Sequence, residues 1–160
     1  TRYIKSMYHG SHINVTRNTM QECDLSDNSE ASEADLPARI VYVEDNPANV
    51  RLLEFLIARH DDLSLAAAET GEAGVELIQK TLPDLVLMDI GLPGIDGFEA
   101  LRQLKADDTT RHIPIIAISA NAMPHDVEKG RQAGFMSYLT KPIDINELLE
   151  AVKQILSENT

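Results

Sequence analysis

From Arg39 onward, the chain alternates five times between a short apolar run and a segment with helical periodicity. The apolar runs have the length and composition of buried β-strands. They cover residues 40–43, 63–67, 85–88, 113–118 and 135–139. Strands that alternate with helices in this way predict a parallel sheet with helices on both faces. The predicted fold class is therefore α/β.

The segments between the strands carry helix signals. Pro47 and Pro124 are suited to open a helix, and Thr70 is suited to cap one. The helix that begins at Pro124 differs from the others because Val127 and Ala133 are its main apolar anchors. Poor apolar contact is typical of elements that move. We therefore expect this fourth helix to be the most weakly held.

Residues 1–36 differ from the rest of the chain. They lack a sustained apolar period, and their acidic stretch, rich in Ser and Asn, has the composition of a solvated linker. We expect a flexible N-terminal tail over residues 1–36 and one domain over residues 37–160. The single cysteine, Cys23, allows no internal disulfide, which fits a reducing compartment.

Membrane insertion and nucleic-acid binding are both disfavoured. No apolar run reaches the roughly 20 residues that span a bilayer, and no signal-peptide pattern opens the sequence. The net charge of −12 opposes direct binding of nucleic acid, because phosphate contacts need a basic surface. We expect a soluble, cytoplasmic protein.

Polar side chains stand where four of the five strands end. The first strand is followed by Glu44 and Asp45, the third by Asp89, the fourth by Ser119 and the fifth by Lys141. The carboxyl ends of parallel strands meet at one edge of a sheet, where ligands and chemistry usually lie. We therefore expect three carboxylates, a hydroxyl and an ammonium in one shared pocket.

Such a pocket favours phosphoryl chemistry. Three carboxylates in one cleft repel by a few kcal/mol per close pair, so they need a cation or a proton. Hard oxygen ligands with room for water suit Mg²⁺. A metal and an ammonium beside a free carboxylate, here Asp89, are the equipment for accepting a phosphoryl group.

Four motifs in the sequence carry a resemblance to a known family. They are Val43–Pro47, Met88–Gly97, Ile118–Ala120 and Tyr138–Pro142. In this order they closely resemble the receiver domain of two-component response regulators, over about residues 37–156. The resemblance implies a flavodoxin-like fold, a doubly wound sheet of five parallel strands in the order 2-1-3-4-5 with five helices.

The resemblance also implies residue roles around a metal. Asp89 would accept the phosphoryl group from a phosphohistidine of a histidine kinase or histidine phosphotransfer protein. Glu44 and Asp45 would hold Mg²⁺ together with Asp89 and the backbone carbonyl of Gly91. Glu44 stands where Asp is commoner in the family; it keeps the charge on a longer arm, so direct and water-mediated coordination both stay open.

Further implied roles concern the response to phosphorylation. Lys141 would pair with the phosphoryl group, and the Lys141–Pro142 bond would be cis. Ser119, in place of the family's Thr, would move to hydrogen-bond the phosphoryl group, and the ring of Tyr138 would swing inward with it; a plain core aromatic is the alternative role for Tyr138. We expect these motions to change the face made of the fourth helix, the fifth strand and the fifth helix, which is also the expected surface of a homodimer.

Several alternatives stay open at this stage. A phosphatase that uses Asp89 as nucleophile would want a second acid nearby, and position 91 is Gly. A nucleotide- or flavin-binding domain would need a Gly-rich loop where Glu44–Pro47 stands. A phosphorylation-independent interaction module would not need the acids and Lys141. The chain is either a free-standing receiver or part of a larger protein such as a hybrid histidine kinase. Asn46–Asn49 and Ser119–Met123 resemble the hybrid-kinase subgroup, which favours the second origin.

Overall fold

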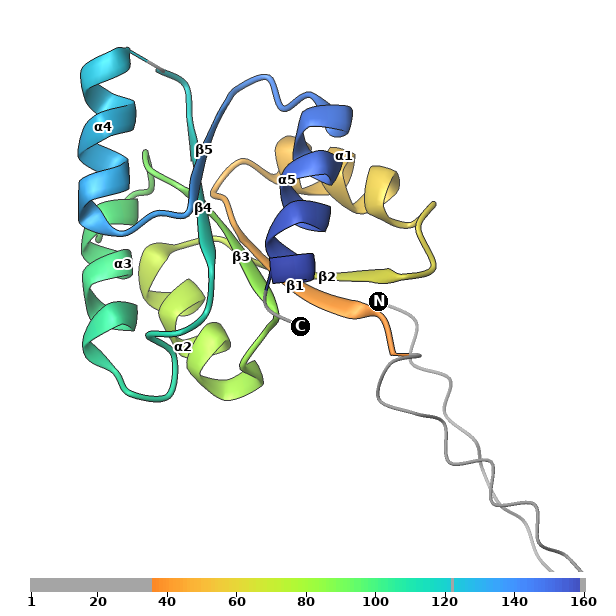
Figure 1. The fold of residues 1–160 in the computed structure, drawn as a ribbon, viewed down its shortest axis with the longest axis horizontal. Coiled ribbons are helices and arrows are strands. Elements are labelled where there is room, and N and C mark those ends of the chain that lie inside the picture. The colour runs from red at the N-terminus through yellow and green to blue at the C-terminus, as the bar shows by residue number, and fades with distance from the viewer. Residues whose placement is uncertain (1–35, 122, 159–160) are drawn as a thin grey trace, which may run out of the picture. The chain divides into compact units, whose positions relative to one another are not determined.

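The computed structural model describes residues 36–121 and 123–158. Within these residues five strands form one parallel sheet in the order β2-β1-β3-β4-β5 (Figure 1). The strands are β1 Ala38–Val43, β2 Leu63–Ala68, β3 Leu85–Asp89, β4 Ile115–Ser119 and β5 Ser137–Thr140. The helices are α1 Pro47–Ile57, α2 Gly71–Thr81, α3 Gly97–Ala106, α4 Pro124–Ala133 and α5 Ile145–Glu158. The predicted fold class and strand order are confirmed. The expected tail, residues 1–35 of it, and Cys23 lie outside the described residues.

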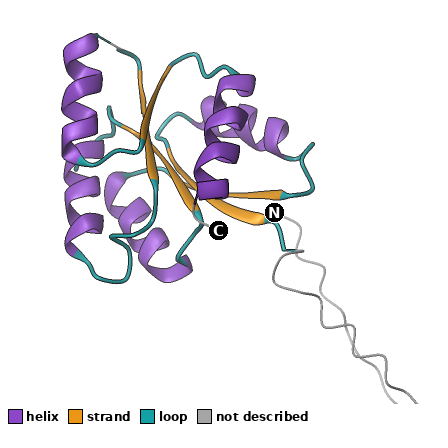
Figure 2. Ribbon diagram, viewed as in Figure 1, coloured by secondary structure: helices purple, strands orange, loops and turns teal. Residues whose placement is uncertain are grey.

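Helices cover both faces of the sheet. Figures 1 and 2 show α1 and α5 on one side and α2, α3 and α4 on the other. Successive strand residues point to opposite faces, so Val41 packs with the α2 and α3 side chains while Ile40 packs with those of α1 and α5. Every residue of β3 and β4 is buried, as expected of strands covered on both faces. Burial of each large side chain stabilises the fold by about 1.5–3 kcal/mol.

Three predicted strand starts are wrong by two residues, and all the strand ends after the first lie one residue later than predicted. The first strand begins at Ala38 rather than residue 40. The fourth strand begins at Ile115 rather than residue 113, because Pro114 has no N–H to donate to a neighbouring strand. The fifth begins at Ser137 rather than residue 135. Phe135 instead donates its N–H to the Gly130 carbonyl at 3.1 Å, and so its N–H caps the C-terminal end of α4.

The weak attachment of α4 has a different basis from the one expected. Val127 and Ala133 are both exposed, so neither anchors the helix. The buried residue of α4 is Gly130. A Cβ atom there would lie 2.9 Å from Cδ2 of Tyr138, so the α4 backbone rests directly on that ring.

Helix caps fix the loops that follow the strands. The Asn46 side chain accepts a hydrogen bond from the N–H of Ala48 at 2.9 Å, and Pro47 begins α1. Thr70 caps α2 as predicted, accepting from the N–H of Ala73 at 3.1 Å. Because Asn46 directly follows Glu44 and Asp45, its cap holds the acidic turn at the start of α1.

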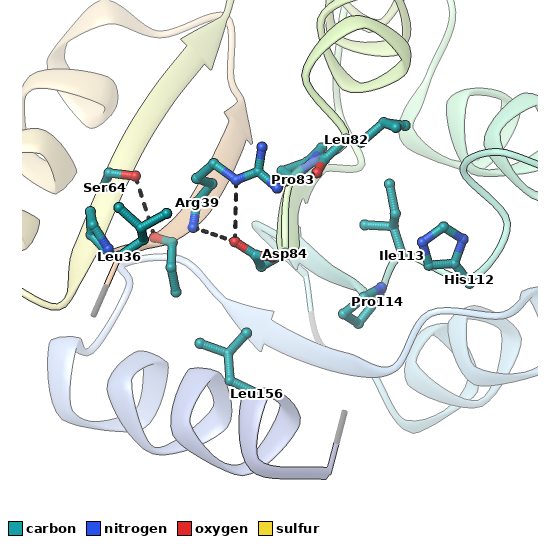
Figure 3. A pocket seen from close by; sticks show the side chains of 12 residues that line it. Leu36, Arg39, Ser64, Leu82, Pro83, Asp84, His112, Ile113, Pro114 and Leu156 are labelled. Atoms are coloured by element: carbon teal, nitrogen blue, oxygen red, sulfur yellow. Dashed lines mark hydrogen bonds and ion pairs between the residues drawn. The ribbon is translucent and has the colours of Figure 1, made fainter. Parts of the chain in front are cut away.

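A hollow of about 1160 Å³ lies at the amino ends of the strands (Figure 3). Arg39 crosses it, donating hydrogen bonds to the carbonyls of Thr81 and Leu82 at 3.0 and 2.9 Å. Its guanidinium also pairs with Asp84 at 3.5 Å, where both side chains are exposed. None of the described helices is both long and apolar enough to cross a membrane.

Candidate functional site

Asp89 ends the central strand β3 at the carboxyl edge of the sheet. It is 4% exposed. Its Oδ1 accepts a hydrogen bond from the N–H of Gly91 at 2.8 Å, and its Oδ2 accepts one from Nζ of Lys141 at 2.6 Å. Each oxygen of this carboxylate is therefore oriented by a donor, one from its own turn and one from the chain after β5.

Lys141 connects two carboxylates. Its Nζ lies 2.6 Å from Asp89 Oδ2 and 2.8 Å from Glu44 Oε2. Burial lowers the pKa of Lys141, but the hydrogen bonds to Asp89 and Glu44 outweigh burial, so the pKa lies above its ordinary value. The ammonium therefore stays charged at neutral pH. The Lys141–Pro142 bond is cis, as the family resemblance implied.

Glu44 is fully buried and receives three hydrogen bonds. The Tyr42 hydroxyl donates to Oε2 at 2.8 Å, the Asn46 N–H donates to Oε1 at 3.0 Å, and Lys141 donates to Oε2. Burial raises the pKa of Glu44, but these hydrogen bonds outweigh it and hold the pKa below its ordinary value. Burial and the hydrogen bond to Glu44 both raise the pKa of Tyr42, so its hydroxyl stays protonated and donates.

The three carboxylates expected to hold a metal lie together. Glu44, Asp45 and Asp89 each offer an oxygen within 4.8 Å of the others, and Asp45 is exposed to solvent. Oxygen ligands at such spacing suit a hard divalent cation. Gly91 lies beside this group through its N–H, while the metal-binding role of its carbonyl stays a prediction.

Ser119 and Tyr138 both contact Asn121, in the segment between β4 and α4. The Asn121 N–H donates to Oγ of Ser119 at 3.1 Å, and the Asn121 carbonyl accepts from the Tyr138 hydroxyl at 3.2 Å. Ser119 lies one residue beyond Ile118, which pairs with Asp89 across the sheet. The two hydroxyls therefore hold the backbone of one residue from two sides.

The start of α3 packs against the backbone of Asp89. A Cβ atom on Gly97 would lie 2.5 Å from the Asp89 carbonyl oxygen and 2.9 Å from Cα of Ile90. Glycine is therefore required at position 97 for the close approach of two backbones. The same construction at Gly91 meets only Asp89 Oδ1, at 3.6 Å, which is ordinary contact.

Sequence reasoning missed Tyr42. Its place in an apolar strand gave it the role of a core residue, and the ring does pack with Ile40 and Leu53. The signal that was available is the spacing: Tyr42 and Glu44 are two residues apart in an extended segment, so their side chains point the same way. A buried acid two residues after a buried Tyr predicts a hydrogen bond between them.

Comparison with known proteins agrees with this geometry. Residues 40–153 match the response regulator receiver domain family. The polar-differentiation response regulator DivK of Brucella anthropi is 38% identical over 123 residues, which cover 77% of this chain and 99% of DivK. Protein PilH of Pseudomonas aeruginosa is 39% identical over 120 residues, which cover 75% of this chain and 98% of PilH.

Solved structures agree as well. A response regulator from Chloroflexus aurantiacus superimposes with a TM-score of 0.70 and 31% identity, covering 76% of this chain and 98% of that one. The receiver domain of a sensor histidine kinase from Pseudomonas aeruginosa, solved with a magnesium ion in its active-site cleft, gives a TM-score of 0.69 and 33% identity over the same shares. The family match runs from β1 to α5 and so includes all five strands. The chain therefore belongs to the family of response regulator receiver domains, the phosphoryl-accepting signalling domains of two-component systems.

Proposed function

We propose that Asp89 accepts a phosphoryl group from a phosphohistidine, with Mg²⁺ held by the neighbouring carboxylates. The observation that carries this proposal is the setting of Asp89, a nearly buried carboxylate with an ammonium 2.6 Å away and two more carboxylates within metal-binding reach. The donor is a histidine kinase or a histidine phosphotransfer protein. Such donors obtain their phosphoryl group from ATP in the cytoplasm, and we therefore place this chain in the cytoplasm.

The transfer exchanges a phosphorus–nitrogen bond for a phosphorus–oxygen bond. A carboxylate oxygen of Asp89 attacks the phosphorus, the bond to the donor imidazole breaks, and the imidazole nitrogen keeps the electron pair and takes up a proton. Lys141 lies against Asp89 and neutralises part of the charge on the transferred group. The Gly91 N–H restricts the rotation of the Asp89 carboxylate, so the attack direction is set before the donor arrives.

The donor set fits Mg²⁺. Glu44, Asp45, Asp89 and Lys141 together carry a charge of −2 (three carboxylates at −1 and one ammonium at +1). A divalent cation would balance that charge, and the ligands are the oxygens that Mg²⁺ prefers. When bound, Mg²⁺ would neutralise phosphoryl oxygens during transfer. We propose the Gly91 carbonyl as a further ligand, following the family resemblance.

We further propose that phosphorylation changes the face made of α4, β5 and α5. Asn121 is tethered by Ser119 at its N–H and by Tyr138 at its carbonyl. If Ser119 turns toward the phosphoryl group, Asn121 loses the first tether, and α4 has little buried apolar surface to hold it. Amide exchange across residues 123–134 is therefore expected to change when beryllium fluoride, a phosphoryl mimic, binds. Unchanged exchange would contradict this switch.

Exposed apolar side chains support two contact surfaces. The exposed apolar side chains near α4 and β5 are Met123, which caps the start of α4, Val127 on α4, and Met136 just before β5. We propose that a second copy of the chain binds this face in a homodimer. Leu52 and Phe55 are exposed on α1, the helix that follows the acidic turn, and we propose that the phosphohistidine donor contacts them. The similarity to the receiver of a sensor histidine kinase supports an origin within a hybrid kinase.

The proposal is tested by chemical phosphorylation. The chain, its Asp89→Asn variant and an Asp84→Asn control are incubated with acetyl phosphate, with and without Mg²⁺, and the intact masses are measured. We expect one added phosphoryl group on the parent and on the Asp84→Asn control, only with Mg²⁺, and none on Asp89→Asn.

Other results would point to other functions. Equal labelling of Asp89→Asn would place the acceptor elsewhere. A parent that takes up no label and binds no beryllium fluoride would be a phosphorylation-independent interaction module. Many turnovers of phosphate release from phosphoester substrates would indicate a phosphatase.

A further inference from the structure

We propose that Tyr42 is a positioning residue of this site, whose buried hydroxyl holds Oε2 of Glu44 and so leaves Oε1 to serve the metal. The inference rests on the proposed function, because it concerns how the same carboxylates meet Mg²⁺. It adds a residue that lies outside the four family motifs of this chain, the first of which begins at Val43.

The two oxygens of Glu44 are engaged unequally. Oε2 accepts from the Tyr42 hydroxyl and from Lys141, both at 2.8 Å, whereas Oε1 accepts only from the Asn46 N–H at 3.0 Å. A carboxylate oxygen has about two lone-pair sites. Both sites of Oε2 are therefore occupied, and the free site of this carboxylate is on Oε1.

Packing fixes the hydroxyl of Tyr42 in place. The ring is fully buried among side chains that include Ile40 of β1, Leu53 of α1 and Leu148 of α5. Glu44 is fully buried as well, and the strand spacing of two residues points both side chains the same way. The hydroxyl therefore cannot turn to water, and Glu44 cannot rotate without losing this hydrogen bond.

Lys141 does not make Tyr42 redundant. Lys141 divides its ammonium between Glu44 Oε2 and Asp89 Oδ2. When Asp89 carries a phosphoryl group, the added negative charge draws the ammonium toward it. Tyr42 is then the donor that stays on Oε2, so its contribution grows in the phosphorylated state.

The test removes the hydroxyl and keeps the ring. Mg²⁺ binding to the full chain is measured by titration calorimetry for the parent and for Tyr42→Phe. We expect about tenfold weaker binding, because a factor of ten corresponds to about 1.4 kcal/mol, close to the lower end of the contribution of one hydrogen bond to a charged carboxylate. The Mg²⁺ concentration that gives half-maximal labelling by acetyl phosphate is expected to rise by the same factor, while labelling at saturating Mg²⁺ stays within about twofold, because positioning of the metal and not the attack itself is impaired.

Two further variants separate positioning from stability. Ile40→Val deletes a methyl group from the same apolar cluster and is expected to lower the melting temperature without changing Mg²⁺ affinity. In a Glu44→Gln background, Tyr42→Phe is expected to have no additional effect on Mg²⁺ affinity, because the hydroxyl acts through the carboxylate.

The outcomes distinguish this inference from the proposed function. Equal Mg²⁺ affinity of the parent and Tyr42→Phe would overturn the inference, and so would an equal loss in the Glu44→Gln background. A parent that binds no Mg²⁺ would overturn the proposed function, and the inference with it.

Discussion

At the amino ends of the strands, Arg39 and Asp84 form an ion pair whose side chains are 57% and 43% exposed, beside a hollow of about 1160 Å³. At the carboxyl ends, Lys141 pairs with Glu44 and Asp89, whose side chains are 0% and 6% exposed. The hollow at the amino ends therefore accompanies the more solvated charges, whereas the pocket that Lys141 and Tyr42 line has a volume of only about 90 Å³. Buried carboxylates that share one ammonium therefore indicate the reactive end of this sheet better than the volume of a hollow does.

The physical reason is the cost of burying charge. An exposed ion pair is screened by water and contributes about 0–1 kcal/mol. A buried carboxylate persists only with partners, and removal of one partner leaves an uncompensated charge. Among the described residues, every buried side-chain nitrogen or oxygen has a hydrogen-bond partner. The carboxyl edge is therefore a preorganised network, whereas the amino edge is a structural contact.

The largest expected effect comes from Lys141→Met set against Arg39→Met. Loss of Lys141 leaves Glu44 and Asp89 without their shared cation, and we expect labelling by acetyl phosphate to fall about 100-fold. Arg39→Met is expected to lower the free energy of unfolding by about 1 kcal/mol and to leave labelling unchanged. Labelling rates and urea unfolding of both variants check this, and equal labelling of the two would remove the distinction between the edges.

The next effect concerns the backbone beneath Asp89. Gly97→Ala is expected to destabilise the domain by about 1–3 kcal/mol, because its Cβ would lie 2.5 Å from the Asp89 carbonyl oxygen. Gly91→Ala, whose Cβ would lie 3.6 Å from Asp89 Oδ1, is the matched control with the smaller cost. Urea unfolding measures both. If Gly97→Ala proves no less stable than Gly91→Ala, the close approach of α3 to β3 is not as described.

The smallest effect is a pH dependence. The pKa of Glu44 is held below its ordinary value in the fold, so its hydrogen bonds stabilise the domain above the unfolded pKa of about 4.3. That stability is lost as the pH falls through the lower, folded pKa. In chelator and without metal, the free energy of unfolding of the parent should fall more steeply below about pH 4.3 than that of Glu44→Gln. Parallel curves would show that Glu44 gains nothing from its partners.

Much of the fold follows from periodicity. The alternation of apolar strands and helices predicted the fold class, and the family motifs supplied the strand order, both of which the structure confirms. Boundaries failed where a local backbone group decided them. The missing N–H of Pro114 delays β4, and the N–H of Phe135 is used by α4. The pattern of apolar residues does not show which backbone N–H groups are missing or already hydrogen-bonded.

The site was predictable where strands end and less so within them. Strand ends locate Asp89 and Lys141 at one edge, and their side chains do meet; their chemical roles stay predictions. Tyr42 was missed because an aromatic residue in a strand is usually core. The anchors of α4 were misjudged because its contact with Tyr138 runs through Gly130, whose lack of a side chain is invisible to an apolar count.

The most direct test is a map of amide chemical shifts upon addition of Mg²⁺ and beryllium fluoride to the ¹⁵N-labelled chain. We predict the largest changes at the carboxyl edge, at Asn46, Gly91 and Asn121, and only small changes at Arg39 and Asp84. Omission of Mg²⁺ should abolish the response. Large changes centred on Arg39 and Asp84, or a response that does not require Mg²⁺, would contradict a metal-dependent phosphoacceptor at Asp89.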